Sequence, residues 1–304
     1  MNLRKHFKQR KLDQFWWFVS ERQTIWYKRF VDAFPPPWTD DYVLQSERFT
    51  NVYRELDPGT QYAIHSILEL REPVPDKIFN IMIYRLIGRK ETHSRLGFQK
   101  LATFDSGQME YVLKEIRDKL EQPPFTGAYM VASFSQMGSS DKIENIASLF
   151  ELVQKNFANT YQKILSARDP QEAYKAIKNN YGFGEFLSYQ VLVDLLYPLR
   201  VNGNRSILPF THDVWAKAGP GAKRGIGILL KKNTKLKPLD VMLDLRRGQR
   251  QEFTRLGIDF PFLRDTDGTE REISLANIQN CLCEYHKYVK IGEGTGKGRR
   301  KFRA

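Results

Sequence analysis

The sequence has very little cysteine: Cys281 and Cys283 are its only two among 304 residues. On a helix, a spacing of two points the thiols to different sides, so this pair fits neither a disulfide framework nor a zinc site. No apolar run approaches the roughly 18 residues of a membrane-spanning helix, and the basic start leads into an amphipathic pattern instead of a secretory apolar core. We therefore expect a soluble protein of a reducing cytoplasm that contacts no membrane.

Acidic residues are also in short supply, with 35 aspartates and glutamates against 48 lysines and arginines, for a formal charge of +13. A polyanion is the partner that such a charge explains most simply, and nucleic acid comes before membrane. The alternative without a specific partner is a solvated basic surface that only keeps the protein soluble. The ends favour the first interpretation, because the expected basic tail 291–304 holds the densest cluster: Lys297, Arg299, Arg300, Lys301 and Arg303.

A nucleotide-binding loop is missing as well. The stretch Gly292–Lys297 is rich in glycine, but a Walker loop needs four residues between its glycines and Ser or Thr after the lysine, where Gly298 stands here. An ATP-dependent kinase of that class is not expected from these residues. Isolated histidines indicate no metal site, so we predict no metal and no cofactor, leaving open whether a divalent ion assists.

Helical periodicity dominates what is present. Apolar residues between Leu12 and Phe30 recur at three, four or seven positions, and prolines 35–37 end that helix. Thr39 is predicted to cap a second helix that buries Tyr42, Phe49, Tyr53 and Leu56, and a long helix is expected over 140–164. Asp169 and Pro170 have the pattern of a cap and a first turn. Strand patterns are few: 127–134, and 260–272 as a possible hairpin around Asp267 and Gly268.

No repeat and no flexible linker divides the chain. The sequence predicts one compact domain over 1–304, mostly α-helical, with at most a small β-hairpin. Gln122, Pro123 and Pro124 mark a soft boundary near residue 125 between two possible lobes.

A glycine-containing turn, Asn180–Gly184, lies between two predicted helices, the layout of a helix-hairpin-helix. Gly182 and Gly184 would let the backbone turn tightly, so that amides at the next helix start grip a DNA phosphate without sequence preference. An ordinary interhelical turn is the equally simple alternative.

A second glycine cluster, Gly219–Gly225, precedes an apolar run. Gly219 and Gly221 before a helix would expose backbone amides, and Lys223 and Arg224 add charge, so we predict a phosphate site. The alternative is a loop that carries two exposed basic side chains.

Carboxylates in unusual surroundings are the remaining signal. Asp194 lies within an apolar run, where it must be paired, hydrogen-bonded or protonated, either at an active site or in a buried ion pair. Asp213 comes a few residues before Gly219 and could serve as a base beside an anion held there, or as a helix cap. A polar stripe at a helical spacing of three, facing water or a cleft, consists of Arg48, Asn51, Arg54 and Asp57.

Five segments in order along the chain, namely 37–41, 48–57, 181–190, 218–222 and 277–288, resemble the helical thymine-hypermodification family. That family includes the helical domain of 5-hydroxymethyluracil DNA kinases, the α-glutamyl/putrescinyl thymine pyrophosphorylases and bacteriophage amino acid:DNA transferases. The resemblance implies a fold related to helix-hairpin-helix DNA glycosylases. It also implies double-stranded DNA with modified thymine as substrate, a free amino acid or amine as donor, functional coupling to a DNA kinase, and the host cytoplasm as location if a phage encodes the chain.

Without a kinase loop, the chain looks like the transferase branch, which would displace the phosphate or pyrophosphate from activated 5-hydroxymethyluracil and install an amine such as glycine. The chemistry needs a carboxylate base and cations or amides for the departing phosphate. We predict Asp213, Asp194 and Glu284 as catalytic residues, and a substrate-binding set of Arg54, Asp57, Asn51 and Lys287. The alternatives are a base-excising glycosylase, which would leave abasic DNA, and a non-catalytic DNA-binding partner of a 5-hydroxymethyluracil DNA kinase.

Overall fold

A computed structural model describes residues 4–265 and 267–296 of the chain. These residues form two compact units. Unit 1 joins the two ends of the chain, Met1–Asp57 and His212–Ala304, and unit 2 is the middle, Pro58–Thr211. The soft boundary expected near residue 125 therefore falls inside unit 2, because the apolar side chains on both sides of it pack into the same core. Residues 297–304 of the expected basic tail lie outside the described residues.

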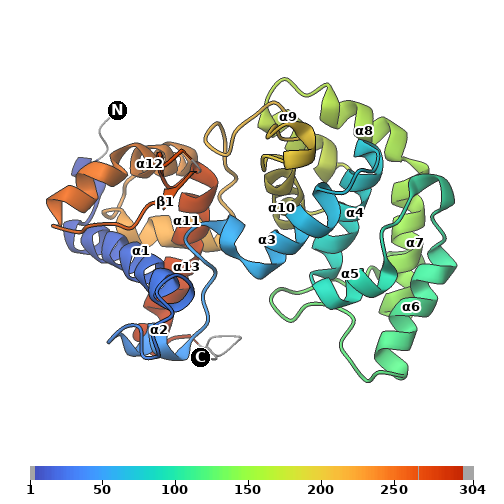
Figure 1. Cartoon of the computed structure of the whole chain (residues 1–304), viewed down its shortest axis with the longest axis horizontal. Helices are drawn as coiled ribbons and strands as arrows, with labels where there is room; N and C mark the ends of the chain where they lie inside the picture. The colour runs from blue at the N-terminus through green and yellow to red at the C-terminus, as the bar shows by residue number, and fades with distance from the viewer. Residues whose placement is uncertain (1–3, 266, 297–304) are drawn as a thin grey trace. The chain divides into compact units, whose positions relative to one another are not determined.

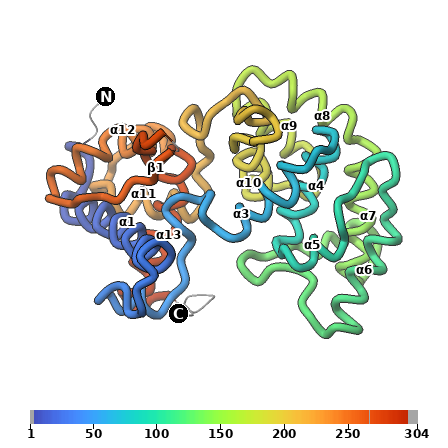
Figure 2. The backbone as a smooth tube through the Cα atoms, viewed as in Figure 1, coloured from blue at the N-terminus to red at the C-terminus, as the bar shows by residue number. Residues whose placement is uncertain are grey.

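Unit 1 interleaves helices from both ends of the chain, so blue and red segments lie side by side in Figure 2. Its N-terminal part contains the 3₁₀ turn η1 (Arg4–His6), α1 (Gln9–Phe30), α2 (Tyr42–Ser46) and the 3₁₀ turn η2 (Arg54–Leu56). Its C-terminal part contains α11 (Pro220–Leu229), α12 (Pro238–Arg255), β1 (Leu263–Arg264), β2 (Glu270–Arg271) and α13 (Leu275–Gly292).

Helix α1 supplies the aromatic core of unit 1. Phe15, Trp16 and Phe18 are fully buried, and burial of each such side chain contributes about 1.5–3 kcal/mol. The Phe15 ring meets Tyr285 of α13 edge-on at 5.4 Å, and the Trp16 ring meets Phe253 of α12 at 5.0 Å. The apolar stripe predicted from Leu12 onward is thus the face that docks α1 against both C-terminal helices.

Helices α11 and α13 cross at very short range because glycine lines the contact. A Cβ atom at Gly225 would overlap the carbonyl oxygen of Leu282, and one at Gly221 would overlap the Cys283 sulfur. These two glycines are four residues apart and share one face of α11. Gly221, predicted to bind phosphate, therefore has a packing role at this crossing.

The second helix is much shorter than predicted. Asp41 is its N-cap and accepts a hydrogen bond from the Leu44 amide, while the predicted cap, Thr39, accepts one from the Asp41 amide. Residues 47–53 are not helical, and Tyr42 is 64% exposed instead of buried. The helix that we predicted over 48–57 from the spacing of its polar residues is therefore wrong.

Unit 2 is helical throughout its core. Its first half contains α3 (Pro58–Ala63), the π-helical turn η3 (Ile64–Leu68), α4 (Val74–Ile87), α5 (Lys90–Leu96), the 3₁₀ turn η4 (Leu101–Thr103) and α6 (Ser106–Asp118). Its second half contains the 3₁₀ turn η5 (Ser135–Met137), α7 (Lys142–Lys155), α8 (Phe157–Leu165), α9 (Pro170–Lys178), α10 (Glu185–Leu195) and the 3₁₀ turn η6 (Arg200–Asn202).

Helix α4 is buried along nearly its whole length and forms the centre of unit 2. The Phe79 ring on it meets Phe104, Phe150 and Phe157 edge-on at 5.1–6.0 Å. The single long helix expected over 140–164 is interrupted at Asn156, which ends α7 and precedes α8.

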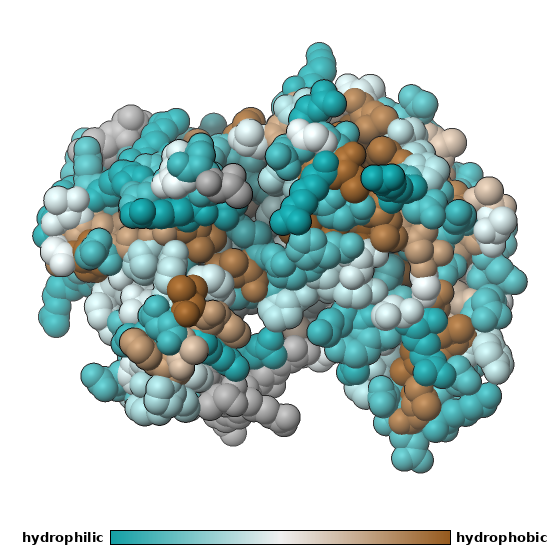
Figure 3. All heavy atoms as spheres, viewed as in Figure 1, coloured by the Kyte–Doolittle hydropathy of each residue, from teal (hydrophilic) through white to brown (hydrophobic). Residues whose placement is uncertain are grey.

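The expectation of a mostly helical fold with one small hairpin is confirmed. Strands β1 and β2 pair antiparallel, with Leu263 opposite Arg271, inside the range where the hairpin was expected. The other candidate strand, 127–134, is irregular. In the part of the chain that the structure describes, no helix combines the length and the apolar character that crossing a membrane requires. Hydrophilic side chains cover most of the face drawn in Figure 3, and hydrophobic atoms show through in separate areas.

Candidate functional site

The segment 47–57 of unit 1 lies along one face of α13, held by polar side chains at a spacing of three and four residues. The Arg54 amide donates to Asn277 Oδ1 at 3.1 Å, and the Thr50 amide donates to Glu284 Oε2 at 3.2 Å. Asn280 lies between them and donates through Nδ2 to Thr50 Oγ1 at 2.9 Å. These bonds replace the helical ones that a non-helical segment cannot make. The sequence segments 48–57 and 277–288 thus form one surface.

Asp57 ends this segment and is its most perturbed carboxylate. Its Oδ1 accepts a hydrogen bond from the Asn51 amide at 2.9 Å. Burial raises the pKa of Asp57 to about 6, although the Asn51 hydrogen bond and the charges of Arg22 and Arg54 act in the opposite direction. Asn51 and Asp57 were predicted to share a helix face, and they meet instead through a tight loop. Carboxylates with raised pKa values are suited to proton transfer near neutral pH.

Arg22 of α1 faces the same cluster and was not predicted. The residue is only 7% exposed. Its guanidinium carbon lies 5.7 Å from the ring centroid of Phe18 and 5.4 Å from that of Phe49. Burial lowers the pKa of Arg22, while the nearby charges of Glu284 and Asp57 partly restore it. The signal in the sequence was its position, because a charged residue at 22 interrupts the apolar stripe of α1.

Lys287 and Glu284 form an opposite-charge pair one helical turn apart on α13. Lys287 Nζ lies 3.8 Å from Glu284 Oε2, 4.4 Å from the centroid of the Phe49 ring, and donates a hydrogen bond to the Arg48 carbonyl. Burial lowers the pKa of Lys287. Two carboxylates and three cations therefore gather here: Asp57, Glu284, Arg22, Arg54 and Lys287. We call this set the charged cluster.

The two cysteines of α13 border the charged cluster but are poor nucleophiles. Cys281 is buried, and burial raises its pKa to about 12. Burial likewise raises the pKa of Cys283 to about 11. Because the thiolate is the reactive form, neither thiol is activated for covalent chemistry at neutral pH. The prediction that they form no disulfide agrees with their state in the structure, where both are free.

The start of α11 lies next to the same stretch of α13. Gly219 is the N-cap, and a Cβ built there would meet nothing within 4 Å. Lys223 and Arg224, near the start of the helix, are exposed. The positive charge of Arg224 contributes to lowering the pKa of His286, after the larger effect of burial, so its side chain lies close to α13. Of the phosphate-binding residues predicted in this loop, Lys223 and Arg224 are exposed, whereas Gly219 and Gly221 are half-buried.

Asp213 is engaged elsewhere in unit 1. Its Oδ1 accepts from Arg246 Nε at 2.9 Å and from the Leu275 amide at 3.0 Å, and its Oδ2 accepts from Arg246 Nη2 at 3.3 Å. Arg246 also pairs with Glu272 at 2.9 Å. Asp213 thus ties the start of α13 to α12. The segment around Trp215 is not helical, so Asp213 caps no helix there, and its role as a base stays a prediction.

Asp194 and the predicted hairpin glycines belong to unit 2. Asp194 is fully buried and receives two hydrogen bonds of 2.5 Å from Arg85 of α4. Gly182 has φ +86°, and a Cβ there would lie 2.7 Å from Leu149 Cδ2. Gly184 caps α10 with an extended backbone and open space around it. The hairpin has the predicted helix–turn–helix order, with α9 before it and α10 after it.

Positive charge is concentrated in unit 1, which holds 30 lysines and arginines against 19 acidic residues, whereas unit 2 holds 18 against 16. Two stretches without acidic residues, 1–12 and 214–239, contain twelve of these basic residues. Backbone hydrogen bonds join them: the Lys8 amide donates to Leu229 O at 2.7 Å, and the Lys231 amide to His6 O at 2.9 Å.

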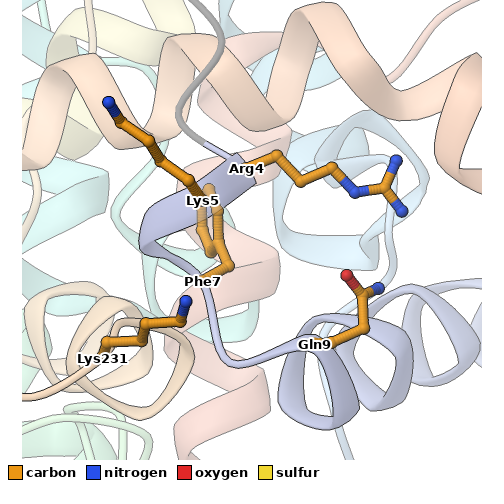
Figure 4. Close-up of a pocket in the computed structure, with 5 residues that line it drawn as sticks. All are labelled: Arg4, Lys5, Phe7, Gln9 and Lys231. Carbon is orange, nitrogen blue, oxygen red and sulfur yellow. The ribbon is translucent and has the colours of Figure 1, made fainter.

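The junction of these stretches contains an open pocket of about 570 Å³. Lys5 and Lys231 line one side of it, Arg4 and Gln9 the other, and the Phe7 ring lies between them (Figure 4). We call its three cationic residues and the exposed Lys8 the basic junction. Its charge suits a polyanion backbone more than a small neutral ligand.

Comparison with known proteins identifies the family of the chain and a curated relative. The sequence profile of the family described as "5-hmdU DNA kinase, helical domain" matches residues 9–298. A protein of Bacillus phage SP10 named "5-hmdU DNA kinase" is 28% identical over 305 residues, covering 95% of this chain and 47% of the phage protein. The chain thus spans about half the length of the curated relative it matches. No solved structure matches it, so the kinship with DNA glycosylases stays a prediction.

Proposed function

Because the chain belongs to the family of 5-hmdU DNA kinase helical domains, we propose that it is an amino acid:DNA transferase acting on activated 5-hydroxymethyluracil in DNA. Membership supports a role in thymine hypermodification. The relative's name, a DNA kinase, refers to phosphate transfer. The match covers 47% of that relative's length. We assign activation of the base to a separate kinase activity, to which this chain is functionally coupled, and assign the following step to this chain.

The proposed step replaces a carbon–oxygen bond with a carbon–nitrogen bond. A donor ammonium group first gives one proton to a carboxylate, and the neutral amine then attacks the 5-methylene carbon of the base. The bond from that carbon to the phosphate oxygen breaks, and the phosphate or pyrophosphate departs with the electron pair. The product is a secondary ammonium on the enlarged base, and the sugar bond is untouched.

Asp57 is the residue that we assign as the base. The single observation that carries the proposal is its partly buried carboxylate, whose pKa burial raises to about 6, among three cations. Such a group remains ionised at neutral pH yet is more basic than an ordinary carboxylate. This assignment moves the catalytic role from Asp213 and Asp194, whose oxygens are paired with Arg246 and Arg85, to a residue first predicted to bind substrate.

The other cations of the site can stabilise the departing phosphate or pyrophosphate. Lys287 and Arg54 belong to the charged cluster, and the start of α11 adds backbone amides together with Lys223 and Arg224. Negative charge develops on the leaving oxygen during the reaction, and donors fixed in position stabilise it without reorganisation. Glu284 then has a positioning role, because it holds Lys287 and the Thr50 amide.

The test is mass spectrometry of nucleosides after the protein has been incubated with double-stranded DNA containing phosphorylated or pyrophosphorylated 5-hydroxymethyluracil and a mixture of amino acids. A transferase yields a nucleoside whose mass shows that one amino acid has replaced the phosphate on the 5-methylene carbon. Abasic sites would establish the glycosylase alternative. Tight binding to this DNA with no change in any nucleoside mass would establish the non-catalytic alternative.

A further inference from the structure

The guanidinium of Arg22 is buried without a hydrogen-bonding partner at one of its nitrogens. Among the described residues, Nη1 finds no acceptor, and no carboxylate oxygen lies within 4.0 Å of the side chain's nitrogens. A buried charge of this kind is costly unless an anion compensates it. Packing alone does not explain an arginine here, since an apolar side chain of similar length would fill the same space.

The aromatic residues around Arg22 contact its guanidinium but give Nη1 no acceptor. Phe18 and Phe49 contact the guanidinium through their rings, and aromatic faces attract such a cation without accepting its in-plane hydrogen bonds. The charges of Glu284 and Asp57 are close enough to influence Arg22, yet neither carboxylate pairs with it. The arrangement is a buried cation whose Nη1 has no acceptor, close to the charges of two carboxylates.

We infer that Arg22 binds the α-carboxylate of the amino-acid donor, an inference that rests on the proposed function. The guanidinium presents a planar fork of donors that matches a carboxylate. A zwitterion also matches the charges next to it, because its ammonium group can face Asp57, the proposed base, while its carboxylate faces Arg22. A phosphate has no ammonium group to face Asp57, so at Arg22 it would bring only negative charge to the two carboxylates, whereas Lys287 and Arg54 remain for the leaving phosphate.

The inference is tested by ligand binding in the absence of DNA. Each of the twenty amino acids is titrated singly by calorimetry into the full chain, and the best binder is compared with its own carboxamide and with inorganic phosphate. We expect the carboxamide to bind roughly 10- to 100-fold more weakly, as is usual when a charge-assisted hydrogen bond is lost. Inorganic phosphate should bind this site more weakly still.

Arg22→Met is the informative variant, and Arg29→Met is its control on the same helix, because Arg29 also lies against aromatic rings, those of Phe30 and Trp38. We expect Arg22→Met to lose about 10-fold or more in amino-acid affinity and to bind acid and carboxamide equally. It should melt at or above the wild-type temperature, since it removes a buried charge. If it does not fold, Arg22→Lys keeps the charge, loses the fork and should lose most of the acid-over-amide preference.

Three results would overturn the inference: wild-type protein that binds none of the amino acids, a folded Arg22→Met variant with unchanged preference, or binding of inorganic phosphate that depends on Arg22 while amino-acid binding does not. Failure of the proposed function is a different outcome. Amino-acid binding that depends on Arg22, together with no change in nucleoside mass, keeps this site and rejects the transferase. Nucleoside modification with an amino-acid KM unaffected by Arg22→Met keeps the transferase and rejects this site.

Discussion

Arg85 holds Asp194 with two hydrogen bonds of 2.5 Å, from Nε to Oδ2 and from Nη2 to Oδ1, in the core of unit 2. The Asp194 side chain is fully buried and that of Arg85 is 13% exposed. Both oxygens of the carboxylate are therefore occupied by one bidentate partner, the geometry of a structural pair. The sequence suggested two roles for Asp194, catalysis or a buried ion pair, and this contact favours the ion pair.

Asp194→Asn should therefore destabilise the protein without a specific effect on transfer. Loss of the charge leaves the Arg85 guanidinium buried and uncompensated, which costs about 3–5 kcal/mol in the free energy of unfolding. Urea denaturation measures this cost. Asp169→Asn is the matched control in unit 2, because Asp169 is the exposed N-cap of α9 and asparagine caps equally well. A stable Asp194→Asn variant with no transfer activity would return Asp194 to the catalytic role.

Local signals in the sequence identified elements whose bonds are local. The cap at Asp169 is one case, since its Oδ1 accepts from the Glu172 amide at 2.8 Å and Pro170 begins the helix, as predicted. Segment 47–57 is the opposite case. Its aromatic spacing suits a helix, but its amides bond to side chains of α13 more than 200 residues away, and nothing within the segment indicates those partners.

The candidate site was predictable only in part for the same reason. Asn51, Arg54, Asp57, Glu284 and Lys287 were all identified, but from a resemblance and a spacing that do not say which residues meet. Arg22 was missed although it interrupts the apolar stripe of α1, because the lack of an acceptor at its Nη1 is visible only in the packed structure. Asp213 was chosen for its nearness in sequence to Gly219, whereas the structure ties it to Arg246 and the start of α13.

Asp57→Asn should abolish most transfer while stabilising the fold. The variant can still accept the Asn51 hydrogen bond but cannot take a proton from the donor, and loss of a general base typically lowers the rate about 10²- to 10⁴-fold. The wild-type single-turnover rate should rise with pH through about 6, where burial places the pKa of Asp57. Asp213→Asn is the control, expected to keep this pH profile. A wild-type rate independent of pH between 5 and 8 would contradict the assignment.

The stability of the same variant depends on pH with a definite sign. Because burial raises the pKa of Asp57, the folded protein binds the proton more tightly than the unfolded chain, and the ionised carboxylate opposes folding above about pH 6. Asp57→Asn should therefore melt above wild type at pH 8, and the difference should shrink as pH falls from 6 toward 4. A lower melting temperature at pH 8 would mean that the charge itself supports the fold.

The hairpin of unit 2 offers two glycines with opposite expectations. Gly182→Ala should destabilise the protein by about 1–3 kcal/mol, since an L-residue is strained in that backbone conformation and the methyl group would press on Leu149. Gly184→Ala should fold normally, because its backbone is extended and the space around it is open. If amides at the start of α10 bind a DNA phosphate, the new methyl group should weaken DNA affinity.

Gly248→Ala is the control for Gly184→Ala. Gly248 lies within α12 of unit 1, a Cβ there meets nothing within 4 Å, and alanine in a helix interior stabilises by about 1 kcal/mol. We expect unchanged DNA affinity from this control in a gel-shift or anisotropy assay. Equal affinities for wild type and Gly184→Ala would show that the hairpin is an ordinary turn.

The basic junction of unit 1 should contribute to DNA binding through phosphates. The double variant Lys5→Gln/Lys231→Gln removes two charges from one side of the pocket without touching the backbone bonds that join the two stretches. Each lost phosphate contact should reduce the slope of log affinity against log salt by about 0.9, so the double variant should lose about 1.8. The loss should be the same for every DNA sequence, because phosphate contacts carry no base information.

Fluorescence anisotropy at several salt concentrations measures that slope. Lys119→Gln/Lys155→Gln is the matched control, since both lysines are exposed on unit 2 and pair with glutamates one helical turn away, Glu115 and Glu151. The control should leave the slope within experimental error of wild type, because those lysines are already compensated. If both double variants reduce affinity equally, DNA binding follows net charge alone. If only the Lys5 and Lys231 variant changes the slope, DNA passes over the basic junction.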